Sequence, residues 1–101
     1  MKKITLTCAH AIVKYLIAQK ILINGKKDPL FPGGFGIFGH GNVACLGQAL
    51  EESKKELPTY RGHHEQNMAL TGIGYARAKR RQQIFVATSS VGPGATNMVT
   101  A

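Results

Sequence analysis

Short β-prone segments alternate with helical segments along this 101-residue chain. Three segments have strand character, and they are 35–38, 59–61 and 84–88. Apolar spacing and capping residues predict helices over 7–19, 43–55 and 65–80, with another beginning at Ala95. This alternation predicts an α/β fold: a partial, Rossmann-like parallel sheet with right-handed crossovers and helices on both faces.

The segment between the first predicted helix and the first predicted strand, residues 21–32, reads as a connector. Asn24-Gly25 is a typical turn, and two prolines interrupt regular structure. Thr7 and Asn42 are expected to cap the helices that follow them. Three strands and an unfinished helix do not complete such a sheet. We therefore expect residues 1–101 to be the N-terminal part of one domain, truncated after about three strands.

A formal net charge of +8 is compatible with nucleic-acid binding, but the basic residues are spread along the chain. The densest group, residues 79–81, lies where a helix should end, and cations there complement the helix dipole. We therefore expect a solvated basic surface and no nucleic-acid partner. A small basic α/β binding module stays open as the alternative from a different functional class.

The chain shows no membrane or export signal. No run approaches the roughly 20 apolar residues of a membrane helix, and the N-terminus lacks a signal-peptide core and a cleavage site. Cys8 and Cys45 lack CxxC spacing and lie in apolar helical contexts. We expect both to be small buried residues rather than a disulfide or zinc pair, in a cytoplasmic protein without a membrane partner.

Polar or glycine-rich turns follow each predicted strand, at residues 39–42, 62–66 and 88–97. Ligands bind beyond the carboxyl ends of the strands in a parallel sheet, so these turns predict one site. Each turn also has a structural interpretation. Glu65 is compatible with a simple helix-dipole partner, and Gly92-Pro93-Gly94 with a strand-to-helix turn. His63 and His64 are adjacent and have no third ligand, which makes a metal site improbable.

Two motifs decide between these interpretations. Residues 62–69 read Gly-His-His-Glu-Gln-Asn-Met-Ala and are followed at 74–78 by Gly-Tyr-Ala-Arg-Ala. Residues 88–97 read Thr-Ser-Ser-Val-Gly-Pro-Gly-Ala-Thr-Asn. Together, and at this separation, they resemble the acetolactate-synthase-like superfamily of thiamine diphosphate enzymes. The resemblance covers essentially the whole chain.

This resemblance implies that residues 1–101 form the front of a pyrimidine-binding domain with thiamine diphosphate as cofactor. Glu65 would be a catalytic and cofactor-binding residue: it would hydrogen-bond a pyrimidine ring nitrogen and so help the thiazolium carbon lose its proton. Gly92, Pro93 and Asn97 would shape the wall around the pyrimidine.

The resemblance also implies what this chain does not hold. In the superfamily a second domain binds the diphosphate through Mg²⁺, with a Gly-Asp-Gly start and an Asn ending, and this chain has no such segment. The cofactor there lies between two subunits. We therefore expect no metal ligand in residues 1–101, a homo-oligomeric full-length enzyme (a dimer or tetramer), and no turnover by this chain alone.

A narrower resemblance concerns residues 37–43, 47–51 and 89–94. They look like the branch that opens a cyclic 1,2-dione, a trihydroxycyclohexanedione, to 5-deoxy-glucuronate by C–C hydrolysis in myo-inositol breakdown. His40 stands where other members usually carry proline, and Ser90-Val91 departs from their commoner motif. A small cyclic dione is then the implied substrate, with His40 as a candidate for substrate contact or proton transfer, against a plain turn role. An acetolactate synthase or 2-oxo acid decarboxylase is the alternative.

Overall fold

A three-stranded parallel sheet lies at the centre of the computed structural model, which describes residues 2–101 and, at His40, the backbone only. The strands are β3 (Gly34–Gly36), β4 (Thr59–Arg61) and β5 (Val86–Thr88), in the order β4-β3-β5. The predicted parallel α/β sheet is therefore confirmed. β3 and β5 are each shorter than the strands expected from 35–38 and 84–88.

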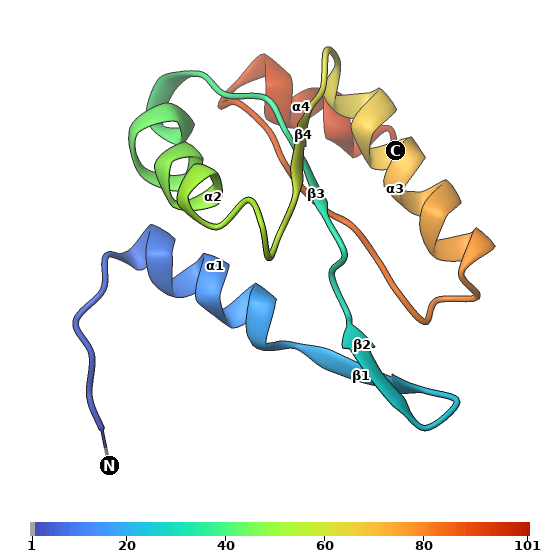
Figure 1. Ribbon diagram of the computed structural model, residues 1–101. Helices are drawn as coiled ribbons and strands as arrows, with labels where there is room; N and C mark the ends of the chain where they lie inside the picture. Colours follow the sequence, from blue (N-terminus) through green and yellow to red (C-terminus); the bar gives the residue numbers. More distant parts are fainter. Residues whose placement is uncertain (1) are drawn as a thin grey trace.

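Helices lie on both faces of this sheet, as predicted (Figure 1). α1 (Cys8–Ala18) and α2 (Gln48–Glu52) lie on one face, and α3 (Glu65–Ala78) and α4 (Pro93–Val99) lie on the other. The buried apolar cluster on the first face consists of Ala9, Val13, Ala49, Leu50 and Leu57. Because these residues come from α1, α2 and the segment before β4, their burial attaches both helices to the sheet.

Aromatic side chains hold α3 against the second face. The Phe85 ring lies 4.7 Å from the Tyr75 ring and 5.0 Å from the Phe35 ring, measured between centroids. These are ordinary distances for favourable tilted aromatic pairs. A Cβ added at Gly33 would lie 2.9 Å from the Phe85 ring, so the glycine permits this close approach. The aromatic contacts set the position of α3 over the strands.

Residues 21–32 form a β-hairpin and its exit rather than an irregular connector, so this prediction was wrong. β1 (Lys20–Ile23) pairs antiparallel with β2 (Lys26–Pro29). The Asn24-Gly25 turn has φ values of 51° and 80°, and two positive values suit the tight hairpin turns that Asn-Gly favours. Pro29 ends an edge strand, where a missing amide hydrogen is tolerated, so it does not exclude a strand.

The segment predicted as one helix over 43–55 is divided. It consists of η2 (Val43–Gly47, a π turn) followed by α2, and η1 (His40–Asn42, a 3₁₀ turn) directly precedes it. Asn42 does not cap this segment, contrary to expectation. Its side-chain amide instead donates to the Thr88 hydroxyl at 3.1 Å and to the Ser89 carbonyl. The amide therefore joins two turns rather than starting a helix.

The loop that ends α3 adopts a strained backbone. Arg80 and Arg81 have φ values of 53° and 62°, and the Arg81 amide donates to the Ala76 carbonyl at 2.7 Å. Glycine is the usual residue in such a left-handed helix ending. A non-glycine residue costs roughly 1–2 kcal/mol there, whereas a cation near a helix C-terminus gains about 0.3–1 kcal/mol. The helix dipole alone does not offset two strained arginines.

Both cysteines are exposed, which corrects the expectation that they are buried. Cys8 is the first residue of α1 and Cys45 lies in η2, and the apolar neighbours that suggested burial lie on other faces of these turns. Within residues 2–101, no helix has the length and apolar character needed to cross a membrane.

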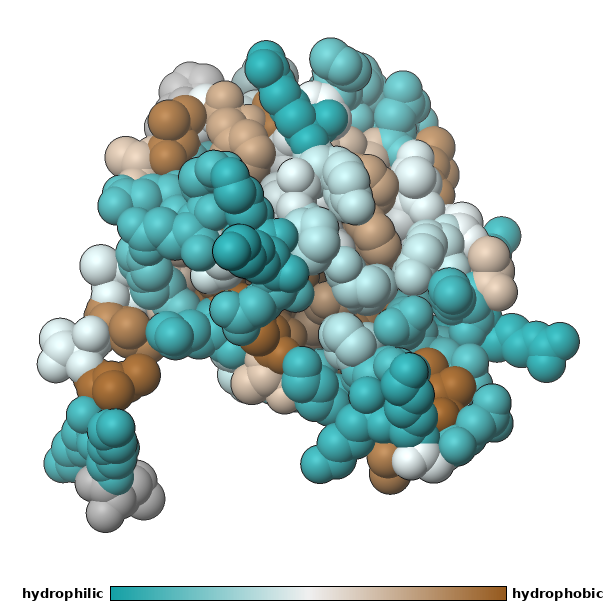
Figure 2. Space-filling model, viewed as in Figure 1, coloured by the Kyte–Doolittle hydropathy of each residue, from teal (hydrophilic) through white to brown (hydrophobic). Residues whose placement is uncertain are grey.

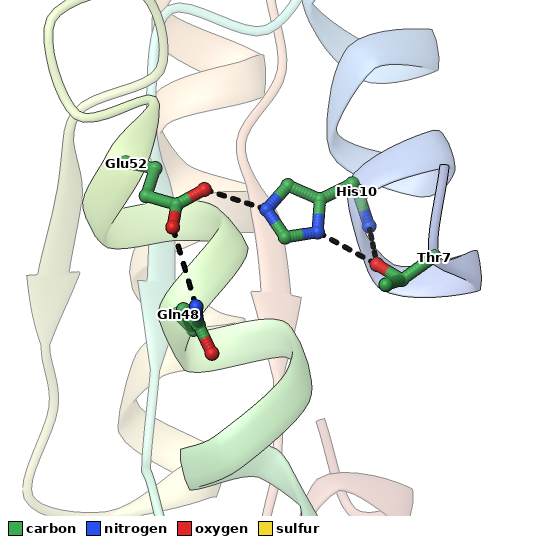
Figure 3. A network of polar contacts seen from close by, with 4 residues as sticks. All are labelled: Thr7, His10, Gln48 and Glu52. Atoms are coloured by element: carbon green, nitrogen blue, oxygen red, sulfur yellow. Dashed lines mark hydrogen bonds and ion pairs between the residues drawn. The ribbon is translucent and has the colours of Figure 1, made fainter. Parts of the chain in front are cut away.

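A polar network links α1 to α2 (Figure 3). The Thr7 side chain caps α1, as predicted, by accepting from the His10 amide. His10 Nε2 lies 2.6 Å from Glu52 Oε2, and Gln48 donates to Glu52 Oε1 at 3.3 Å. A carboxylate only accepts, so Nε2 carries the proton, and Nδ1 is free to accept from the Thr7 hydroxyl 2.6 Å away.

The hydrogen bonds from His10 and then Gln48 lower the pKa of Glu52 below its ordinary value of 4.5. A lowered pKa in the folded state means that Glu52 stabilises the fold above pH 4.5 and that this contribution is lost as the pH falls through the lowered value.

We expect Glu52→Gln to lower the unfolding temperature slightly at neutral pH, with the difference disappearing in acid. Thermal unfolding followed by circular dichroism measures this. Glu56→Gln, at another exposed glutamate, is the control, and a pH-independent effect of Glu52→Gln would contradict the prediction.

Candidate functional site

Three turns meet at one edge of the sheet because β3, β4 and β5 are parallel. The turn after β4 leads directly into α3, whose first residue is Glu65. His64 caps this helix: its Nδ1 accepts from the Gln66 amide at 3.2 Å. The cap fixes the first turn of α3 and, with it, the direction in which Glu65 leaves the backbone.

Glu65 is the one charged residue that is buried among those described, with an exposed fraction of 6%. The Ser90 hydroxyl donates to Glu65 Oε1 at 3.3 Å. Because β3 separates β4 from β5, this bond spans the end of the central strand and joins two turns that the sheet does not pair. Among residues 2–101, Ser90 is the hydrogen-bond donor to this carboxylate, so Oε2 has capacity to accept from a ligand.

Gly94 lies against this carboxylate at the start of α4. A Cβ added there would meet the Ser90 hydroxyl and the Glu65 carboxylate, and it would lie 3.1 Å from Glu65 Cδ. α3 and α4 also pack against each other. The absence of a side chain at Gly94 is therefore what lets the two helix starts approach, with the carboxylate of Glu65 between them.

The turn after β3 is joined to the same edge by Asn42, whose amide reaches Thr88 and Ser89 next to Ser90. All three turns are thus connected by side chains: Asn42 joins the first to the third, and Glu65 joins the second to the third. Such cross-links hold polar groups in place before a ligand arrives.

The other predicted site residues lie near this edge but take less part in it. Gly92 and Pro93 are exposed at the start of α4, and Gly92 has φ +66°, a conformation that favours glycine. Asn97 is half-buried on α4. The backbone of His40 begins η1, after β3, whereas its side chain lies outside the described part of the chain.

Sequence reasoning missed Ser90, Gly94 and Asn42 as site residues. In the sequence, Ser90 is distinguished only by a departure from the commoner motif, and Gly94 only by its place in a turn. Their roles depend on which turns meet in space, which local patterns do not show. In the residues described there is no cluster of three or more potential metal ligands, and His64 serves as a helix cap.

A separate surface pocket of about 380 Å³ lies between α2 and β4 and includes Phe38, Lys54 and Arg61 in its lining. None of the residues predicted to contact a cofactor lines it. We place the candidate site at Glu65 instead, because a buried carboxylate held between two turns is the more specific chemical feature.

Comparison with known families gives this geometry its context. Residues 34–101 match the model of the thiamine pyrophosphate enzyme, N-terminal TPP binding domain. The chain belongs to this family. The match contains all three strands of the sheet, the buried Glu65 and the turn from Thr88 to Gly94, so the predicted superfamily and its thiamine diphosphate cofactor are confirmed.

Individual relatives are much longer than this chain. It is 55% identical over 100 residues to the 3D-(3,5/4)-trihydroxycyclohexane-1,2-dione hydrolase of Geobacillus thermodenitrificans. It is 50% identical over 101 residues to the enzyme of the same name from Clostridium tetani, and 49% over 100 residues to that from Bacillus thuringiensis. These matches cover 99–100% of this chain, which spans 16% of the length of each relative.

The contact between Gly94 and Glu65 gives a second prediction about stability. We expect Gly94→Ala to destabilise the fold by about 1–3 kcal/mol, the usual cost of overpacking, because its Cβ would collide with Ser90 and Glu65. Chemical denaturation with a structural probe measures the free energy of unfolding.

The matched control is Gly74→Ala, in the middle of α3, where an added Cβ meets nothing within 4 Å. Alanine is favoured over glycine in a helix by roughly 0.5–1 kcal/mol, so this variant should be more stable than the parent. Equal changes of the same sign in the two variants would show that Gly94 has no special packing role.

Proposed function

We propose that this chain is the N-terminal part of a thiamine diphosphate-dependent hydrolase that opens a cyclic 1,2-dione by cleaving a carbon–carbon bond with water. The observation that supports it most is the buried Glu65, held at the meeting point of the turns after β4 and β5. Identities of 49–55% across the whole chain to relatives named as trihydroxycyclohexane-1,2-dione hydrolases support the substrate class.

Several features of the site fit the pyrimidine part of the cofactor. Glu65 is mostly shielded from water, its Oε2 has capacity for another hydrogen bond, and Gly94 permits the close approach of α4 to its carboxylate. When bound, thiamine diphosphate supplies a nucleophilic carbon and an electron sink for the bond cleavage. In our proposal Glu65 exchanges a proton with a pyrimidine ring nitrogen, while Ser90 orients the carboxylate through Oε1.

The remaining site residues have supporting roles in this proposal. Gly92 and Pro93 set the start of α4, and Asn97 on the same helix forms part of the wall around the pyrimidine. His40 contacts the dione or transfers a proton to it, because imidazole can change its protonation state near neutral pH. Its backbone position, in the turn directly after β3, supports a place at the same edge of the sheet.

We also propose that other parts of the complete protein contribute the rest of the site. The diphosphate and Mg²⁺ would be held by a second domain, and a second subunit would complete a homo-oligomer. Both outer strands, β4 and β5, have an unpaired edge within the described residues. Large apolar side chains are also exposed, and they include Ile4, Leu70, Ile73 and Val99. Figure 2 shows apolar residues on the projecting N-terminal segment. A cytoplasmic location agrees with two free cysteines.

The central test uses the complete polypeptide in which these residues occur. We expect it to convert trihydroxycyclohexane-1,2-dione to the ring-opened acid, and Glu65→Gln to lower kcat by at least about a hundredfold, the scale of losing proton transfer. Product formation can be followed by chromatography, with circular dichroism to check folding. Glu56→Gln, at an exposed glutamate of the same chain, is the matched control and should retain activity.

Two results would contradict parts of this proposal. Near-normal turnover by a folded Glu65→Gln variant would remove the role of Glu65. Consumption of pyruvate without ring opening of the dione would assign the protein to the acetolactate synthase or decarboxylase type instead.

A further expectation concerns residues 1–101 by themselves. Because the groups proposed to hold the diphosphate lie elsewhere, we expect the isolated chain to be inactive and to bind thiamine diphosphate only weakly, with little effect of Mg²⁺. Isothermal titration calorimetry with and without Mg²⁺ measures this. Tight, Mg²⁺-dependent binding would show that this chain holds the diphosphate itself.

A further inference from the structure

We propose that the loop ending α3 is a second binding site, in which Arg77, Arg80 and Arg81 bind a phosphoryl group carried by a small molecule. These three arginines line one surface pocket of about 460 Å³. Figure 2 shows hydrophilic side chains projecting at the edge of the molecule where α3 ends in Figure 1. The site is separate from the one at Glu65 and does not depend on the function proposed above.

The guanidinium groups of this pocket have no acidic neighbours. The pocket is lined by these three residues, and all three are exposed. The ion pairs within residues 2–101 involve His10, Glu52, Lys54 and Glu51, and none of the three arginines. A bound anion would give these cations a partner of opposite charge, which the ion pairs of residues 2–101 do not supply.

The backbone conformation of the loop is not the one that would end α3 most stably. Arg80 and Arg81 are consecutive left-handed residues, in positions where glycine would avoid strain. As shown above, the helix dipole does not offset that strain. Residues held in such a conformation are frequently functional. Arg80 and Arg81 line the same pocket as Arg77, so both strained residues belong to the proposed site.

Hydrogen bonds made by Gln83 and Ile84, which directly follow the loop, hold its backbone in place before a ligand binds. The Gln83 side chain donates to the Pro29 carbonyl at 2.9 Å and accepts from the Tyr75 hydroxyl at 3.4 Å. The Ile84 amide donates to the Leu30 carbonyl at 3.0 Å. Less conformational freedom is then lost when a ligand binds.

The chemistry of the side chains selects a phosphoryl group. Guanidinium presents a planar fork of donors that matches phosphate oxygens in bidentate pairs, which a lysine ammonium does not. The neighbouring Lys79 is engaged elsewhere, with its ammonium 5.9 Å from the centre of the Tyr75 ring. In our proposal the three guanidinium groups bind the terminal oxygens of a phosphate monoester dianion.

The distance from Glu65 makes this ligand a separate molecule. α3 has 14 residues, and a rise of about 1.5 Å per residue puts its two ends about 20 Å apart. The arginine loop lies at the end of α3 opposite to Glu65, so a phosphoryl group bound there is not positioned by the carboxylate site.

The test is calorimetric titration of the complete polypeptide with glucose 6-phosphate and with inorganic phosphate, using glucose as the uncharged probe. We expect both phosphates to bind and glucose not to bind. Arg80→Gln combined with Arg81→Gln should weaken phosphate binding at least tenfold. The matched control, Lys26→Gln with Lys27→Gln in the β1–β2 hairpin, removes the same charge and should leave binding unchanged.

A second double variant separates binding from stability. Arg80→Gly with Arg81→Gly should raise the unfolding temperature, because glycine tolerates the left-handed backbone, and still weaken phosphate binding at least tenfold. The proposal is overturned by equal losses in the arginine and lysine variants, or by absence of phosphate binding at millimolar concentration. It is also overturned if duplex DNA binds far more tightly than either phosphate and depends on the same arginines.

Discussion

The parallel ladder β4-β3-β5 is the constraint on which the rest of this structure depends. Because the three strands run in one direction, the turns that follow them meet at one edge although they are far apart in sequence. Only then do two side-chain contacts become possible: Glu65 with Ser90, and Asn42 with Thr88 and Ser89. The hydrogen bonds of the site are consequences of strand direction.

The arrangement of elements could be predicted from sequence because each signal is local. Apolar spacing and a threonine cap identified α1, and an unbroken β-prone run located β5. The hairpin of residues 20–29 was not predicted because two prolines argue against strands, although the Asn-Gly turn is typical of a hairpin. The divided helix after β3 was missed because the side chain of Asn42 has a distant partner, Ser89, that outweighs its capping tendency.

The candidate site could be predicted only in part, for a related reason. A motif identifies Glu65, but it does not say which residue donates to the carboxylate or why the neighbouring helix can approach. Ser90 and Gly94 answer these questions, and both lie more than 20 residues away in the chain. The exposure of Cys8 and Cys45 likewise depends on which side of a helix meets the sheet, not on composition.

The burial of Glu65 distinguishes it from the other glutamates of the chain. The chain is strongly basic, yet this carboxylate has a neutral serine hydroxyl as its hydrogen-bond donor among the described residues. No unpartnered side-chain oxygen is sealed from water in residues 2–101, so Oε2 keeps some contact with solvent. The dipole of α3 stabilises the charge by at most about 2 kcal/mol at its N-terminus. A glutamate kept only to start a helix would be better placed in water, as Glu51, Glu52 and Glu56 are. Glu65 differs from them because it lies between two turns, with Ser90 on Oε1 and with Oε2 able to accept a further hydrogen bond.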